Sequence, residues 1–362
     1  MKNESILVTK PFMPPRKEYD AYLDKIFSSR VLTNNGPLIR KLEKKLEKYL
    51  DSGFLYFIAN GTLSLQIALK ALKIEGGEVI TTPFSFVAST TSILWQGCNP
   101  IFVDVNEGDF NIDANLIEKS ITEKTRAILA VHVFGYPCDV DKIEAIASKY
   151  DLKVIYDGAH AFGVRYKNKS LMSYGDVCTA SFHATKLFHT IEGGACITNN
   201  KDVAKKISLI RQFGYDDSNY VCQGINAKAS EFNAAMGLAN YRYVDRIIEE
   251  RGQLTALYNS LIDSDIKRQV PNFSFDYNYA YYPILFKNEE ELMKVCKILN
   301  DNDVYPRRYF YPSLNKLSYL VKRQVCPVAE DISSRVVCLP LYNGLGRETV
   351  EKICKIISIN TK

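Results

Sequence analysis

Short apolar runs alternate along the first half of the chain with longer stretches in which apolar positions recur every three or four residues. After Gly36-Pro37, the leucines at 38, 42 and 46 share one face opposite lysines and glutamates, which predicts an amphipathic helix. The runs typical of strands cover residues 54–58, 78–82, 100–105, 126–134, 153–157 and 178–182. Because these runs are apolar on both faces and alternate with helical stretches, the pattern predicts a mainly parallel sheet covered by helices.

The pattern changes near Ser230. From there, residues rich in Ala, Tyr, Ile, Arg and Glu predict one long helix, from Glu231 to Leu261, that bridges two domains. A tyrosine-rich region follows, then a helix over 288–301, a strand over 304–312 and a final helix from Arg347. The 362 residues exceed the roughly 250–300 at which a single core stops growing. We therefore predict an α/β protein with a large domain (1–245, with an N-terminal lead) and a smaller C-terminal α+β domain (246–362).

Composition and charge exclude several classes of protein. Hydrophobic residues make up 46% and charged residues 24%, which gives no indication of disorder or of a fibrous repeat. The formal net charge of +5 is small and no long run of like charge occurs, so we expect no nucleic-acid partner. The nine cysteines form no CxxC pair, which argues against a zinc site or a disulfide framework. The N-terminus lacks the apolar stretch of a signal peptide and no segment is typical of a membrane span, so we expect a cytoplasmic protein.

Polar residues follow several predicted strands, at the edge where ligands bind in open parallel sheets. Asn60-Gly61-Thr62 precedes a helix and offers free amides to an anion, although Thr62 as a plain helix cap is the alternative. Asp157 ends a buried strand, where its carboxylate would need a cation or several hydrogen-bond donors. The alternative is that Asp157 only caps a helix. Lys186 lies in a polar loop after another strand, where most lysines are simply solvated. Phe86 could stack on a planar ring or belong to the core.

Taken together, these features are the parts that a phosphorylated pyridine aldehyde needs: an anion site, an aromatic plane, an acid and a lysine. Nine tracts, in this order, also resemble the DegT/DnrJ/EryC1/StrS family of sugar aminotransferases, which are fold-type I pyridoxal phosphate enzymes. The resemblance spans nearly the whole chain. The tracts are NGPLIRKLEKKL, ANGTLSLQIALKAL, GGEVITTPFSFVAST, IFVDV, DGAHAFG, SFHATKLFHTIEGGA, GINAKASEFNAAMG, RRYFYP and CPVAEDISSRVVCLPLYNGL.

The resemblance implies a pyridoxal 5'-phosphate site with Lys186 and Asp157 as catalytic residues. Lys186 would form the Schiff base, Asp157 would pair with the pyridine nitrogen and Phe86 would stack on the ring. The other implied cofactor contacts are Gly61, Thr62 and Ser181 to the phosphate, His160 beside the ring oxygen, and Asn226 to the phosphate of the other subunit. The family therefore implies a homodimer with shared active sites. Ala227-Lys228 departs from the aromatic residue and arginine usual after that asparagine, which puts local substrate contacts in doubt.

The expected reaction moves an amino group from glutamate to a nucleotide-linked 4-keto-6-deoxy sugar, with dTDP as the carrier. The SFHATK tract resembles the branch of the family that aminates carbon 4. The candidate substrate contacts are Arg307, Arg308, Tyr309 and Tyr311; solvated arginines and tyrosines packed between domains are the alternative. Amination at carbon 3, a non-catalytic nucleotide-sugar binding protein and an α-amino-acid aminotransferase are the other hypotheses. A related dehydratase has histidine in place of the lysine, so Lys186 argues against that activity.

Overall fold

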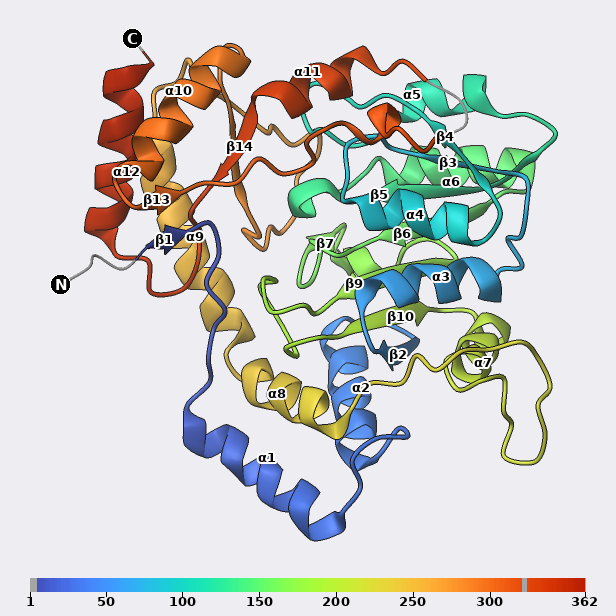
Figure 1. The fold of residues 1–362 in the computed structure, drawn as a ribbon. Coiled ribbons are helices and arrows are strands. Elements are labelled where there is room, and N and C mark those ends of the chain that lie inside the picture. Colours follow the sequence, from blue (N-terminus) through green and yellow to red (C-terminus); the bar gives the residue numbers. More distant parts are fainter. Residues whose placement is uncertain (1–4, 321–323, 362) are drawn as a thin grey trace.

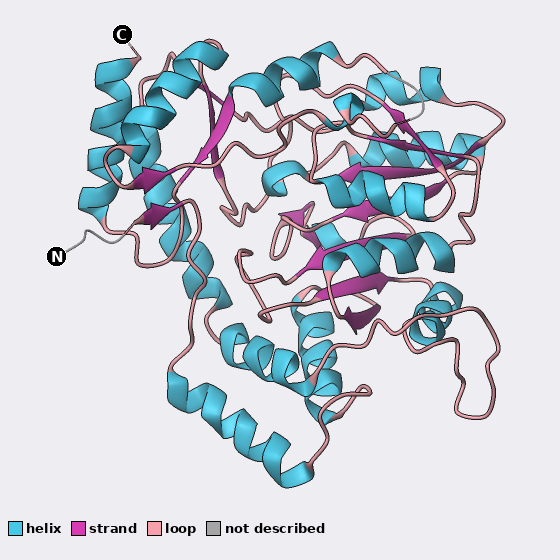
Figure 2. Ribbon diagram, viewed as in Figure 1, coloured by secondary structure: helices cyan, strands magenta, loops and turns pink. Residues whose placement is uncertain are grey.

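The computed structural model describes residues 5–320 and 324–361, and its centre is a seven-stranded sheet with helices on both faces (Figures 1 and 2). The strand order is β2-β10-β9-β6-β5-β3-β4. Among these strands only β10 runs antiparallel to its neighbours, so the predicted α/β class with a mainly parallel sheet is confirmed. The strands are β2 (Phe54–Ile58), β3 (Glu78–Thr81), β4 (Asn99–Phe102), β5 (Thr125–Val131), β6 (Lys153–Asp157), β9 (Val177–Ser181) and β10 (Gly194–Thr198).

Successive residues of the central strands face opposite sides of the sheet and enter two different cores. Ile128 of β5 belongs to one core and Leu129 to the other, and neither is accessible to solvent. This explains why the strands are apolar at every position. The helices of this part of the chain are α1 (Arg16–Ser29), α2 (Pro37–Tyr49), α3 (Gly61–Ala71), α4 (Val87–Trp95), α5 (Ala114–Ile117), α6 (Val140–Tyr150) and α7 (Lys201–Ile210), with a small hairpin of β7 (Arg165–Tyr166) and β8 (Lys169–Ser170).

The long helix predicted from Glu231 to Leu261 is wrong in one respect, because it is two helices, α8 (Glu231–Tyr241) and α9 (Val244–Leu261). The Tyr243 N–H donates to Asn240 O, three residues back, where an α-helix would reach four. The Tyr243 ring packs 5.1 Å from that of Phe12, and its hydroxyl bonds to Glu18. Contacts with the N-terminal segment therefore fix the break between the two helices.

A third core lies around α9 and the C-terminal elements, which gather on the left of Figure 1. It includes strands of an antiparallel sheet in the order β11-β12-β14, and a parallel pair in which β1 joins β13. Of the strand predicted over 304–312, only Val304 and Tyr305 are in a strand, which is β13. The rest of the prediction is wrong, because prolines at 306 and 312 cannot donate a backbone hydrogen bond. The elements around this core are β1 (Ile6–Leu7), β11 (Lys267–Arg268), β12 (Tyr282–Leu285), β13 (Val304–Tyr305), β14 (Val336–Leu339), α10 (Glu289–Asn300) and α12 (Arg347–Asn360), whereas α11 (Pro327–Arg335) buries Ala329 and Ile332 in a core shared with the large sheet.

This third core draws on residues beyond Leu254 and on Ile6 from the other end of the chain. It has the α+β character expected of a smaller domain, and the exact boundary at residue 245 stays a prediction. Among residues 5–320 and 324–361, no helix combines the length and the apolar character that crossing a bilayer requires.

Candidate active site

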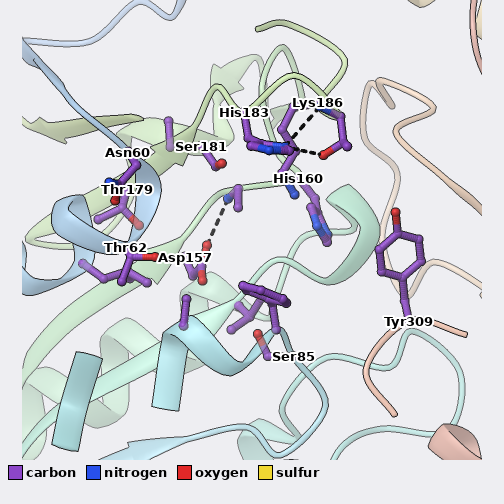
Figure 3. A pocket seen from close by; sticks show the side chains of 18 of the residues that line it. Asn60, Thr62, Ser85, Asp157, His160, Thr179, Ser181, His183, Lys186 and Tyr309 are labelled. Atoms are coloured by element: carbon purple, nitrogen blue, oxygen red, sulfur yellow. Dashed lines mark hydrogen bonds between the residues drawn. The ribbon is translucent and has the colours of Figure 1, made fainter. Parts of the chain in front are cut away.

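A pocket of about 280 Å³ opens at the carboxyl ends of β6 and β9, beside the first turns of α3 and α4. Figure 3 shows Asp157 between Asn60 and Thr62 on one side and Tyr309 on the other, with Lys186 across the cavity. The structure brings most of the predicted site residues to this one cavity. Those that line it are Gly61, Thr62, Phe86, Asp157, His160, Ser181, Lys186, Arg307 and Tyr309.

Lys186 lies in the loop between β9 and β10, and its side chain reaches into the pocket. The backbone of this loop is fixed by the Lys186 N–H, which donates to His183 O at 2.8 Å. Burial lowers the pKa of the Lys186 amine to about 8; the charge of Asp157 opposes this effect and that of Arg307 adds to it. An amine with this pKa is partly neutral near physiological pH, which is the form that acts as a nucleophile or a base.

Asp157 is the last residue of β6 and is held from two sides. Its Oδ2 accepts a hydrogen bond from Ser89 Oγ at 2.9 Å, and its Oδ1 accepts one from the Ala159 N–H at 3.1 Å. The Ser89 hydroxyl lies 2.8 Å from that of Ser85, which lines the pocket. Burial raises the pKa of Asp157, whereas these two hydrogen bonds and the charge of Lys186 lower it. The carboxylate is therefore oriented and fixed before any ligand binds.

The first turn of α3 forms an anion-binding cradle with the end of β9. Asn60 caps this helix, since its Oδ1 accepts from the Leu63 N–H at 2.9 Å; the alternative of Thr62 as the cap is wrong. The first N–H groups of a helix have no partner within it, and they attract anions. A Cβ at Gly61 would lie 3.0 Å from Ser181 Cβ, which is a tight contact, so glycine favours this close approach of the α3 backbone to Ser181.

Two rings, those of His160 and Phe86, line the pocket. His160 Nδ1 accepts from the Phe134 N–H at 3.1 Å, and burial holds the pKa of His160 well below its usual value. The ring is therefore neutral, and its proton is on Nε2, where it can be donated. Phe86 is 60% exposed at the N-terminus of α4, so it does not belong to the core.

Three predicted residues lie outside this cavity. Arg308 turns away to Glu289 Oε1 at 2.7 Å and to Ser334 O at 2.8 Å, and its guanidinium stacks on Tyr311, 3.6 Å from the ring centre. Neither Arg308 nor Tyr311 lines the pocket. Asn226 accepts a hydrogen bond from Lys228 Nζ at 2.8 Å on the exposed segment after α7. Its predicted contact, with the phosphate of another subunit, involves a second chain and stays a prediction.

The structure also adds residues that sequence reasoning missed. Tyr281, Ser85 and Thr179 line the pocket, as do His183 and Glu192 of the Lys186 loop. His183 and Glu192 could have been found from the sequence, because they are close to Lys186 along the chain. Tyr281 lies within the run YNYAYYP, where nothing distinguishes the tyrosine that faces the pocket from its neighbours.

The family model for the DegT/DnrJ/EryC1/StrS aminotransferases matches residues 15–358. A dTDP-4-amino-4,6-dideoxy-D-glucose transaminase of Shigella dysenteriae is 41% identical over 360 residues, covering 97% of this chain and 98% of the relative. The enzyme of that name from Escherichia coli is 38% identical and covers 99% of both chains. The crystal structure of DesI with its TDP-sugar product superposes with a TM-score of 0.94 at 27% identity, over 99% of this chain and 94% of DesI. The chain therefore belongs to the DegT/DnrJ/EryC1/StrS aminotransferase family.

Proposed function

We propose that the protein binds pyridoxal 5'-phosphate and transfers an amino group from glutamate to carbon 4 of a dTDP-linked 4-keto-6-deoxy sugar. The observation that carries the proposal is that Lys186, with its lowered pKa, and the fixed carboxylate of Asp157 line the same pocket. The names of the two transaminases that are 41% and 38% identical support the choice of the sugar, its nucleotide and the aminated carbon.

The residues present fit this cofactor. Gly61 brings the first turn of α3 close to Ser181 at the pocket, and the N–H and hydroxyl donors there suit the anionic phosphate. Phe86 offers an exposed ring face at the pocket, and Asp157 offers a buried acceptor for a protonated ring nitrogen. When bound, the cofactor supplies an aldehyde carbon for the amine and an aromatic ring that withdraws electrons.

Each pocket residue then has a defined task. With the cofactor bound, the neutral amine of Lys186 would take a proton from the donor carbon and give it back to the cofactor carbon, because the same group can act as base and acid. Asp157 keeps the ring nitrogen protonated, and its bonds to Ser89 and Ala159 hold it in place. His160 Nε2 donates toward the ring oxygen. Asn226 would complete the phosphate site of a partner subunit in a homodimer.

The experiment that tests the function uses the purified protein with pyridoxal 5'-phosphate, glutamate and dTDP-4-keto-6-deoxyglucose. We expect one equivalent of 2-oxoglutarate for each sugar consumed, and NMR should place the new nitrogen on carbon 4. Nitrogen on carbon 3 would correct the regiochemistry. No amination, together with tight binding of the nucleotide sugar, would favour a non-catalytic binding protein instead.

Arg307 and Arg308 provide a matched test of substrate binding. Arg307 lines the pocket, where its guanidinium can pair with the diphosphate, whereas Arg308 is engaged with Glu289. Arg307→Ala should raise the KM for the nucleotide sugar by roughly 10-fold or more, since a hydrogen bond to a charged group contributes about 1.5–3 kcal/mol. Arg308→Ala should leave this KM within about 2-fold. Steady-state kinetics with glutamate held saturating would measure both, and equal effects would remove Arg307 from the substrate site.

A further inference from the structure

The amine of Lys186 has a hydrogen-bonding neighbour that comes from the C-terminal part of the chain. The hydroxyl of Tyr281, the residue before β12, lies 3.4 Å from Lys186 Nζ, and the centre of the tyrosine ring lies 5.9 Å from the same nitrogen. A bond of this length is weak, but catalytic hydrogen bonds are often long before the substrate binds. The contact joins a reacting atom to a residue outside the seven-stranded sheet, from the C-terminal part of the chain that also contributes Arg307 and Tyr309 to the pocket.

We propose that Tyr281 is a further catalytic residue, whose hydroxyl holds the freed amine of Lys186 in the orientation needed for proton transfer. This inference rests on the proposed function, because it concerns the same lysine. It adds a residue and a role: the amine must be aimed at two carbon atoms in turn, and a four-carbon side chain without a partner has many rotamers.

The surroundings of Tyr281 keep its hydroxyl in place. Its ring packs edge-on against Tyr309 with centres 5.0 Å apart. On another side the ring of His160 is 4.6 Å away. Because both neighbours also line the pocket, the position of Tyr281 is coupled to the shape of the whole site.

The backbone leading to Tyr281 is fixed by a buried cation. Arg251 of α9 donates from Nε to Tyr279 O at 2.8 Å and from Nη2 to Ala280 O at 2.5 Å. Burial lowers the pKa of Arg251 only to about 10, so the guanidinium stays charged at neutral pH, and hydrogen bonds from a charged donor are the stronger kind. The two residues before Tyr281 are therefore held from α9, and the tyrosine is pre-organised.

The chemistry of a buried phenol suits this role. Burial raises the pKa of Tyr281, so its hydroxyl remains protonated and uncharged at neutral pH. A hydroxyl can donate to the lone pair of a neutral amine and can accept from an amine N–H. Tyr281 can therefore hold Lys186 in both of its protonation states, whereas a carboxylate in the same place would stabilise the ammonium.

The test compares Tyr281→Phe with Tyr282→Phe. Tyr282 is the adjacent residue, and its hydroxyl donates to Asn259 Oδ1 at 2.8 Å, away from the pocket. We expect Tyr281→Phe to take up pyridoxal 5'-phosphate about 10-fold more slowly than wild-type apoenzyme, with uptake measured by absorbance at pH 9. We expect kcat to fall by a similar factor. The KM for the nucleotide sugar should stay within about 2-fold. Tyr282→Phe should match the wild type in all three measurements.

Uptake and kcat of Tyr281→Phe within about 2-fold of the wild type would overturn the inference. If the melting temperature shows that this variant is unfolded, Arg251→Lys replaces it, because it keeps a cation but loses the paired donors to Tyr279 O and Ala280 O that hold the backbone before Tyr281; we then expect about a 3-fold slowing, and no change would overturn the inference. A wild-type protein that does not take up pyridoxal 5'-phosphate would instead refute the proposed function.

Discussion

Replacing Lys186 with alanine should abolish amino transfer. The substitution removes the pocket amine whose pKa is lowered to about 8, and with it both the covalent anchor and the group that moves the proton. Turnover should fall to the detection limit in an assay that follows 2-oxoglutarate formation from glutamate. The bound cofactor should also lose the absorbance that depends on its link to the lysine, which is a readout independent of turnover.

Lys186→Arg is the matched control for charge. Arginine retains a cation in the pocket but cannot become neutral at accessible pH, so it should be as inactive as alanine. A small primary amine added to Lys186→Ala should restore a measurable fraction of the rate, whereas it should not help Lys186→Arg, whose longer side chain fills the space. Turnover of Lys186→Ala at the wild-type rate would show that another residue provides the amine.

Asp157→Asn should lower the rate of amino transfer by on the order of 10²-fold, as expected when a preorganised electrostatic partner is removed. An asparagine has nearly the same shape: its Oδ1 can still accept from the Ala159 N–H, and its amide N–H can donate to Ser89 Oγ, so the loss would report mainly the charge. The pH dependence of the absorbance of the bound cofactor should shift as well, because the ring nitrogen would no longer face a negative charge.

Asp176→Asn is the matched control. Asp176 directly precedes β9, so it lies at the end of the β6–β9 pair that is opposite to Asp157. Its Oδ2 accepts from the Val154 N–H at 2.8 Å, near the start of β6, and it does not line the pocket. An asparagine there keeps an acceptor for this backbone group, so the rate should stay within about 2-fold of the wild type. Near-normal activity of Asp157→Asn would mean that the ring nitrogen is held by something else.

The positions of Asp157 and Ser181 could be predicted from the sequence, because an open parallel sheet binds its ligands at the carboxyl ends of its strands. Once the strands were identified, the residues after their carboxyl ends, such as Asp157 and Ser181, had to share one edge of a parallel sheet. Strand β10 was not predicted, since its five residues are all buried and such a short apolar run carries no periodic signal.

Other features depend on contacts that a single sequence does not contain. In the extended segment after β13, Arg307 and Arg308 point in opposite directions, and no local pattern tells which of the two faces the cavity. The break between α8 and α9 follows from Tyr243 packing on Phe12, far away in the chain. Tyr281 lies next to Lys186, and the backbone before it is held by Arg251 of α9, contacts that join three distant parts of the sequence.

The pairing of β1 with β13 bears on how the protein is made. Ile6 and Leu7 pair with Val304 and Tyr305, and the Leu341 N–H donates to Val8 O, so segments about 300 residues apart in the sequence lie together. During translation the first strand emerges long before its partner has been synthesised. The nascent chain can build the seven-stranded sheet early, while the segment that carries Arg307 and Tyr309 can settle only after the residues beyond 304 have been synthesised. Ribosome-stalled chains ending near residue 300 should accordingly contain an ordered sheet and an unfinished pocket.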